Sequence, residues 1–258
     1  MLKLQRVKRP TELTDKLIAE LTEEFKNTEK AVWKDTAIGI AIEDALLLMS
    51  HHKCCYCECK LKQESNYLNV EHFFPKTLYT DEVLEWDNLF PCCPFCNSKK
   101  GKLDTKKEPI LKPDKDNPQE HLALEQYFIV GKDELGIRTI EKVDLNAFSE
   151  RIAPRRAITE NYQALASSLL DNVQTYATRK QPNGMQDRRN RIIETTKFIL
   201  NKCLPSSVYA AYSATRVLND TRFYQVIKQL MQQENIWTEE LALLEQEAKN
   251  CALEYILS

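Results

Sequence analysis

Residues 54–101 read CCYCECKLKQESNYLNVEHFFPKTLYTDEVLEWDNLFPCCPFCNSKKG, and two Cys-x-x-Cys pairs bracket the stretch: Cys54/Cys57 and Cys93/Cys96. The turn within such a pair brings two sulfur atoms together, and two pairs complete the tetrahedral coordination of a structural zinc ion. The sequence therefore predicts a four-thiolate zinc site. It would fold a segment that buries too little apolar surface to hold itself.

Three further cysteines, Cys55, Cys59 and Cys92, crowd these pairs. The spacings from Cys55 to Cys59 and from Cys92 to Cys96 are one residue too long for a standard pair, so we rank these residues lower as ligands and leave their role open. Seven of the nine cysteines fall between positions 54 and 96. Such a cluster without a secretion signal indicates metal ligation in a reducing cytosol, rather than disulfides.

Composition sets broad limits on the function. The chain has 258 residues, 43% of them hydrophobic, and a formal net charge of −2. Nucleic-acid binding is compatible with this charge, because a local basic face is sufficient. No apolar run approaches a membrane span, and no apolar segment follows the basic start MLKLQRVKRP as a signal peptide requires. We expect a bacterial cytoplasmic protein with no membrane partner.

Apolar spacing predicts a mainly α protein with a small α+β core. Residues at helical spacing predict helices over 12–27 and 38–49 and a helical region from about 146 onward. The last helical stripe runs from Trp237 to Tyr255. Residues 127–130 read as a strand, whereas apolar residues three apart over 137–143 fit a strand or a helix equally well.

The residues between the two cysteine pairs suggest hydrolytic chemistry. Glu71 and His72 project to opposite sides of an extended segment, so they take different roles. The carboxylate suits Mg²⁺, and the histidine suits proton abstraction from water. Asn97 directly follows Cys96, and its carbonyl oxygen is a hard ligand that can complete a Mg²⁺ site beside Glu71. The amide of Asn88 can donate and accept, which suits bridging the loop that carries His72.

The stretch resembles the HNH, or ββα-metal, endonuclease family in the version with a four-cysteine zinc site. The matching motifs are the first cysteine pair, Glu-His at 71–72, WDNL at 86–89 and CPFCNSKKG at 93–101. The resemblance implies that His72 is the general base, Asn88 orients its loop, and Glu71 and Asn97 hold a catalytic Mg²⁺ or Mn²⁺. Glu71 stands where the family commonly has aspartate, which is one methylene shorter.

Other basic residues near this motif are weaker candidates. Lys99, Lys100 and Lys102 lie beside Asn97 and could hold flanking phosphates of DNA without reading sequence. Ordinary surface charge explains each lysine equally well. The remaining histidines, at positions 51, 52 and 121, are expected to be structural.

The wider layout resembles the HNH subunits of Septu-type anti-phage defence systems and of their retron-associated relatives. It consists of a basic arm from Arg6 to Pro10, a helical lead-in, the cysteine-rich stretch, a charged Pro-containing linker and a helical tail. The resemblance implies a hetero-oligomeric complex with an ATPase of the ABC/SMC type, and cleavage of DNA upon infection. The chain has no Walker motif, so control by ATP would come from another chain.

The sequence thus suggests three segments: an arm and lead-in over 1–52, an HNH nuclease over 53–120, and a short β element with helices over 121–258, a candidate for partner docking. The leading hypothesis is a metal-dependent DNA endonuclease for phage defence. A free-standing restriction-type nuclease would need a sequence-reading module that is not evident. A non-cleaving zinc adaptor has no reason to keep Glu71, His72 and Asn97 together.

Overall fold

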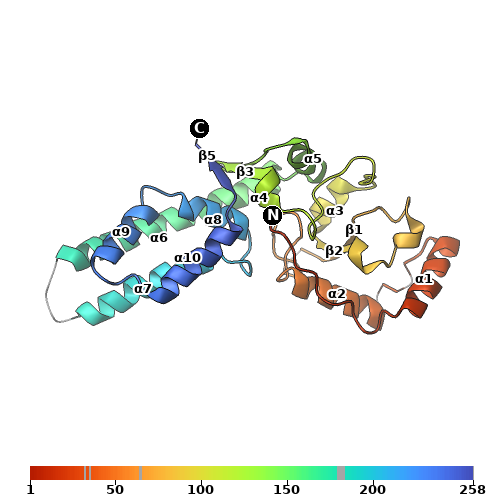
Figure 1. Cartoon of the computed structure of the whole chain (residues 1–258), viewed down its shortest axis with the longest axis horizontal. Helices are drawn as coiled ribbons and strands as arrows, with labels where there is room; N and C mark the ends of the chain where they lie inside the picture. The colour runs from red at the N-terminus through yellow and green to blue at the C-terminus, as the bar shows by residue number, and fades with distance from the viewer. Residues whose placement is uncertain (32, 35, 64–65, 179–183, 258) are drawn as a thin grey trace. The chain divides into compact units, whose positions relative to one another are not determined.

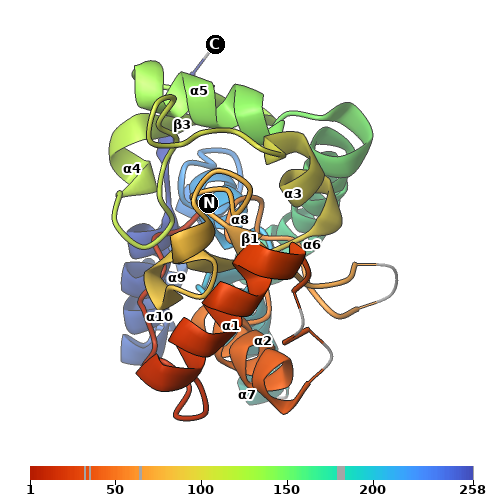
Figure 2. The same ribbon diagram turned by 90° about the vertical axis from the view of Figure 1, so that its right-hand side faces the viewer.

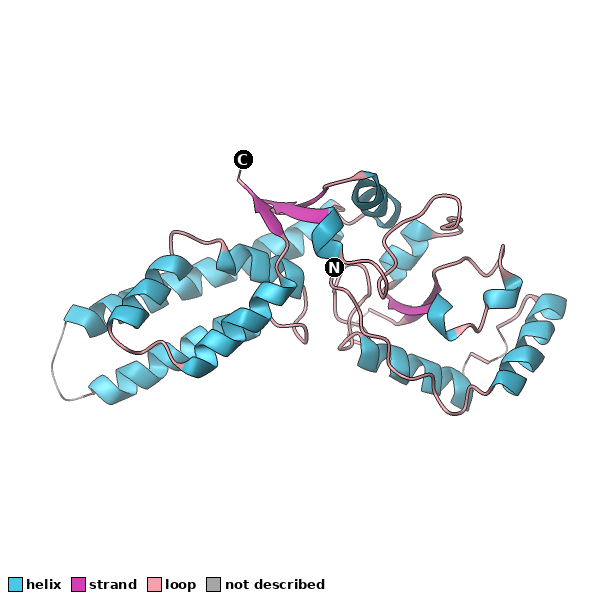
Figure 3. Ribbon diagram, viewed as in Figure 1, coloured by secondary structure: helices cyan, strands magenta, loops and turns pink. Residues whose placement is uncertain are grey.

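The computed structural model describes residues 1–31, 33–34, 36–63, 66–178 and 184–257. The chain divides into two compact units (Figure 1). Unit 1 comprises Met1–His121 and Gly131–Leu145, and unit 2 comprises Leu122–Val130 and the chain from Asn146 onward. Figure 3 shows long loops between the short helices and strands of unit 1, whereas unit 2 is mostly helical. The predicted class, mainly helical α+β, is confirmed.

The N-terminal arm of unit 1 contains no strand: residues 1–10 have no regular secondary structure. Arg6 fixes the arm instead. Its guanidinium donates to the carbonyl oxygens of Trp86 and Leu89, both at 2.8 Å, and lies 2.9 Å from the carboxylate of Asp114. The arm is therefore held by one cation that satisfies several buried acceptors at once.

The two predicted N-terminal helices are confirmed as α1 (Asp15–Thr28) and α2 (Ala37–Met49). The hydroxyl of Thr14 caps α1 by accepting from the backbone N–H of Leu17 at 3.3 Å. Phe25 of α1 is buried against the ring of Trp33, with ring centroids 5.8 Å apart. Trp33 is thus a core residue.

The cysteine-rich part of unit 1 forms two antiparallel strands followed by a helix. Strand β1 (Asn69–His72) pairs with β2 (Leu89–Cys92), and His72 lies opposite Leu89. Helix α3 (Pro94–Lys100) follows directly and packs against β1 (Figure 2). Two 3₁₀ turns, η1 (Thr80–Glu82) and η2 (Trp86–Asn88), lie in the connection between the strands.

Helices α4 (Pro118–His121) and α5 (Glu134–Val143) complete unit 1. The side chain of Asp133 caps α5 by accepting from Gly136 N–H at 2.8 Å. This cap and a packed contact with α3 settle the open choice over 137–143 in favour of a helix.

Unit 2 contains a small sheet in the order β4 (Phe128–Gly131), β3 (Leu122–Glu125), β5 (Glu254–Ile256), with β3 and β5 parallel. The predicted strand over 127–130 is confirmed. The helical stripe to Tyr255 was extended too far, because Tyr255 pairs with Leu124 in the sheet. The N–H of Leu253 donates to the Thr215 hydroxyl, which also draws the chain out of the helix.

The rest of unit 2 is helical, as predicted. A π-helical turn η3 (Phe148–Ile152) leads into five helices: α6 (Ala153–Thr178), α7 (Met185–Asn201), α8 (Ala210–Leu218), α9 (Tyr224–Gln233) and α10 (Glu239–Cys251). Helix α6 packs against α7, α8 and α9, and α10 packs against α7 and α8. Their shared apolar core includes Leu169, Val173 and Met231. None of the described helices has the length and apolarity to cross a membrane.

Candidate metal centre and catalytic cavity

The first cysteine pair sits in a tight turn after α2. His51 and His52 have positive φ angles of 52° and 59° there, and both side chains are exposed. The N–H of Cys54 then donates to the carbonyl of Cys59 at 3.0 Å, which closes the loop around the pair. These histidines shape the turn, in agreement with the structural role expected for them.

The second pair is built into the start of α3. Cys93 is the N-cap residue, and its sulfur accepts from the N–H of Cys96 at 3.4 Å, while Pro94 occupies the first helical turn. The sulfur atoms of Cys54, Cys57, Cys93 and Cys96 lie within 4.8 Å of one another and all four residues are buried. Four converging thiols fit a tetrahedral structural zinc site.

The next residues, Glu71 and His72, occupy opposite sides of β1. Glu71 is 3% exposed, and its carboxylate lies 2.5 Å from the ammonium of Lys100. Burial raises the pKa of Glu71 to about 7 despite the opposing charge of Lys100. The Lys100 ammonium also donates to the carbonyl of His72 at 2.9 Å.

This pairing corrects the role predicted for Lys100. Its side chain is fully buried and holds α3 to β1, so it does not reach a phosphate at the surface. Lys102 is exposed, and Lys99 is half exposed with an ion pair to Asp144 at 2.8 Å. The sequence spacing alone could not separate the one buried lysine from its exposed neighbours.

The ring of His72 is held in a defined tautomer. Its Nε2 lies 2.9 Å from the carbonyl oxygen of Val83, and a carbonyl only accepts, so Nε2 carries the proton. The lone pair is therefore on Nδ1. Burial, with the positive charges of Lys76 and Lys100, lowers the pKa of His72 to about 4. At neutral pH the ring is uncharged and able to accept a proton.

Asn88 connects the loop that follows His72. Its side-chain oxygen accepts from Phe74 N–H at 2.7 Å, and its amide donates to the carbonyls of Phe74 and Glu82 at 3.0 and 2.9 Å. The residue is 2% exposed. Three hydrogen bonds from one buried amide hold both ends of this loop beside β1.

His72 and Asn97 line the same cavity, which has a volume of about 210 Å³. Among the described residues, the side chain of Asn97 has no hydrogen-bond partner. Three further residues line the cavity and were not predicted from the sequence: Lys76, Asn69 and Glu43. Lys76 and Asn69 lie within four residues of His72 and could have been found by proximity. Glu43 comes from α2, and nothing in its local sequence points to this cavity.

A comparison with known proteins decides the family. The chain is 36% identical over 255 residues to the Septu protein PtuB of Bacillus thuringiensis, covering 98% of this chain and 96% of the relative. This chain belongs to the PtuB family. No family model and no solved structure matches the chain.

The match to PtuB spans both compact units. The similarity therefore covers the helical unit as well as the cysteine-rich unit, and is not limited to the cysteine motif. The Septu resemblance derived from the motifs and their order is confirmed. The ring of His121 pairs with the Asp133 carboxylate at 2.6 Å at the start of α5, a contact that fits the structural role expected for it.

Proposed function

We propose that this PtuB-family chain is a metal-dependent HNH endonuclease that hydrolyses DNA phosphodiester bonds as the effector of an anti-phage defence complex. The observation that carries the proposal is the joint position of His72 and Asn97. A neutral imidazole from β1 and a carbonyl donor from α3 line one cavity, within a strand–strand–helix unit clamped by four thiols. Family membership supports the defence role.

His72 acts as the general base in this proposal. The Val83 carbonyl fixes the proton on Nε2, so Nδ1 accepts a proton from water as the water attacks phosphorus. Burial, together with the charge of Lys76 in the same cavity, lowers the pKa of His72 and so keeps the ring unprotonated before the reaction. Asn88 acts as a positioning residue, because its hydrogen bonds fix the loop beyond the base.

In this proposal Asn97 and Glu71 would hold a hard divalent ion such as Mg²⁺ or Mn²⁺. Asn97 offers the cavity a carbonyl oxygen free of protein hydrogen bonds among the described residues. Glu71 does not line this cavity and already pairs with Lys100, so it would serve as a ligand only after exchanging that partner for the ion. When bound, the ion supplies charge stabilisation for the phosphoryl oxygens. Lys99 and Lys102 hold neighbouring phosphates. Lys100 does not, because its ammonium is buried in the ion pair with Glu71.

The test is plasmid cleavage with Mg²⁺ by the purified protein, alone and with the proteins encoded beside it. His72→Ala should lower cleavage at least about 100-fold, since general-base catalysis contributes on this scale. Zinc content should stay unchanged. His121→Ala, which alters a histidine paired with Asp133, should retain activity. Cutting that survives His72→Ala overturns the base assignment, and no cutting in any complex favours the adaptor reading.

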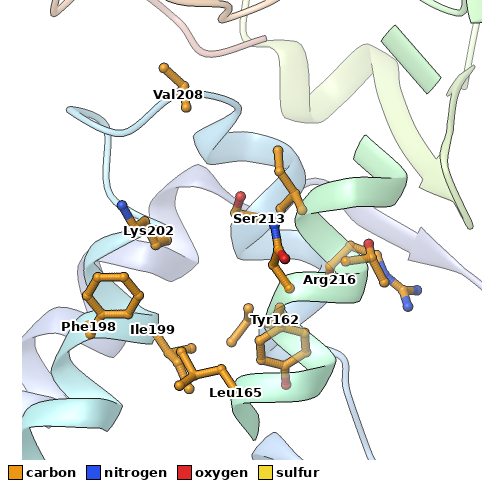
Figure 4. Close-up of a pocket in the computed structure, with 12 residues that line it drawn as sticks. Tyr162, Leu165, Phe198, Ile199, Lys202, Val208, Ser213 and Arg216 are labelled. Atoms are coloured by element: carbon orange, nitrogen blue, oxygen red, sulfur yellow. The ribbon is translucent and has the colours of Figure 1, made fainter. Parts of the chain in front are cut away.

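We further infer that unit 2 docks an ATPase subunit of the ABC/SMC type, a PtuA-like partner. A cavity of about 330 Å³ opens between α6, α7 and α8. Figure 4 shows Phe198 and Ile199 of α7 and Leu165 of α6 at its wall, with Val208 on the loop before α8. Phe198 is 53% exposed, and an exposed aromatic beside an apolar cavity is typical of a binding anchor.

The charges beside this cavity indicate which kind of partner surface would bind there. Lys202 and Arg216 also line this cavity, so it suits an apolar side chain flanked by an acidic residue. Phe198→Asp should abolish co-purification with the neighbouring ATPase. Leu243→Asp should retain it, because Leu243 is an even more exposed apolar residue on α10 that lies outside the cavity. Retention by both variants would place the docking surface elsewhere.

A further inference from the structure

Three buried cysteines remain beside the four-thiolate site, and two of them form a second group with one of its ligands. The sulfur atoms of Cys54, Cys55 and Cys92 all lie within 4.8 Å of one another. The Cys54 and Cys92 sulfurs are 3.8 Å apart. This equals the spacing of the Cys57 and Cys93 sulfurs within the first site. It is also close to the ~3.8 Å that two sulfurs keep when each is about 2.3 Å from one tetrahedral zinc ion.

A backbone hydrogen bond holds two cysteines of this second group side by side. The N–H of Cys55 donates to the carbonyl of Pro91 at 2.8 Å, which ties the first cysteine pair to β2. Cys92 is the next residue of that strand, so the hydrogen bond sets its sulfur beside that of Cys55. Both residues are at most 2% exposed.

We propose that Cys54, Cys55 and Cys92 bind a second zinc-class ion, and that the Cys54 thiolate bridges it to the four-thiolate zinc. The chain would then hold a two-metal, six-thiolate cluster rather than a single zinc knuckle pair.

An orphaned polar atom supports an ion at this position. Tyr56 is fully buried, and its hydroxyl has no hydrogen-bond partner among the described residues. Besides burial, the groups whose charge acts on this hydroxyl are Glu71, Cys55, Cys92 and Cys54. A buried hydroxyl without a partner is costly, and a nearby ion with a vacant fourth position would give the Tyr56 oxygen a ligand role.

Charge also favours a second ion over two extra thiolates alone. A single zinc with four thiolates already carries a net negative charge in a buried site. Cys55 and Cys92 as thiolates would add two negative charges, and a second divalent ion would offset those two added charges. Cys203 and Cys251 of unit 2 show the alternative, since each is a buried thiol that belongs to no group of candidate metal ligands among the described residues.

The decisive measurement is metal content of the full chain, purified under reducing conditions and analysed by native mass spectrometry. We expect two zinc ions per chain. The double variant Cys55→Ser/Cys92→Ser should lose one of them and keep the other. The control is Cys203→Ser, because Cys203 is a fully buried thiol of unit 2 that lies outside both groups. It should keep two ions.

One zinc in the unaltered chain overturns the proposal, and so does a double variant that still holds two. Substitution with ¹¹³Cd provides a readout that needs no variant. A shared Cys54 sulfur predicts two cadmium resonances that are split by coupling to each other. A single resonance, or two without coupling, contradicts the bridge even if every serine variant fails to fold.

Discussion

Unit 1 and unit 2 each bury a core, but the side chains that form the two cores differ in kind. Unit 1 buries seven cysteines and the Glu71–Lys100 ion pair among short elements and long loops (Figure 3). Unit 2 buries leucine, isoleucine, valine and alanine side chains between helices of up to 26 residues. We expect the stability of unit 1 to depend on ions and paired charges, and that of unit 2 on apolar packing.

The largest expected effect is removal of zinc. Structural zinc contributes on the order of 10 kcal/mol to the folding of small metal-bound modules. Cys93→Ser, or a strong chelator, should therefore unfold the cysteine-rich part of unit 1 and leave the helices of unit 2 protected. Hydrogen exchange measured by mass spectrometry resolves the two units, with Cys203→Ser as the control. Equal loss of protection in both units would break the comparison.

The next effect comes from the buried ion pair. Lys100→Met leaves the Glu71 carboxylate without its cation, and breaking a buried pair in this way costs about 3–5 kcal/mol. Lys102→Met, at an exposed position two residues further along, should change the unfolding free energy by less than about 0.5 kcal/mol. Urea unfolding of both variants measures the difference. Similar values for the two lysines would show that Lys100 is not buried as described.

Unit 2 contains a buried polar network around Glu245, and its contribution to stability should respond to pH. Glu245 is 6% exposed and accepts from Tyr224 at 2.9 Å and from Lys228 at 2.6 Å. Burial alone would raise the pKa of Glu245, but these hydrogen bonds hold it below its ordinary value of 4.5. The carboxylate thus stabilises unit 2 above pH 4.5, and this contribution is lost as the pH falls below that value.

Glu245→Gln should accordingly lower the unfolding free energy by about 1.5–3 kcal/mol at pH 7. The gap to the unaltered protein should close as the pH falls below 4.5. Denaturant unfolding followed by circular dichroism at several pH values measures this gap. A gap that stays constant with pH would mean that the charge of Glu245 is not what stabilises the network.

The smallest effect should be the same in both units. Thr14 and Thr238 cap α1 and α10 by accepting from the backbone N–H three residues later. Replacing either by alanine should cost about 1 kcal/mol, because capping is local and independent of the core behind the helix. Thermal unfolding of the two variants provides the measurement. Markedly unequal losses would show that the units differ even at their helix ends.

The features predicted correctly from the sequence are those that depend on residues close together along the chain. The two cysteine pairs, the helices α1 and α2 and the position of β4 all follow from patterns within about fifteen residues. The burial of Lys100 was not predictable, because three lysines within four positions look alike until Glu71 selects one of them.

Long-range pairing explains most of the remaining misses. Tyr255 fits the apolar stripe of α10, yet it pairs with Leu124 of β3, far away in the sequence. No local pattern encodes such a partner. Glu43 likewise reaches the cavity of His72 only because α2 packs against β2. The candidate site was thus proposed from its motif, whereas the other residues that line its cavity could be identified only from the fold.

The position of the β3–β4 hairpin in the sequence limits where the chain can be divided into separate units. Residues 122–130 belong to unit 2, yet unit 1 resumes at Gly131 with the segment that forms α5. The backbone therefore passes between the units three times. A truncation after residue 120 would strip α5 from α3, and a single proteolytic nick cannot release either half intact. Swapping one half between relatives would require exchanging the hairpin as well.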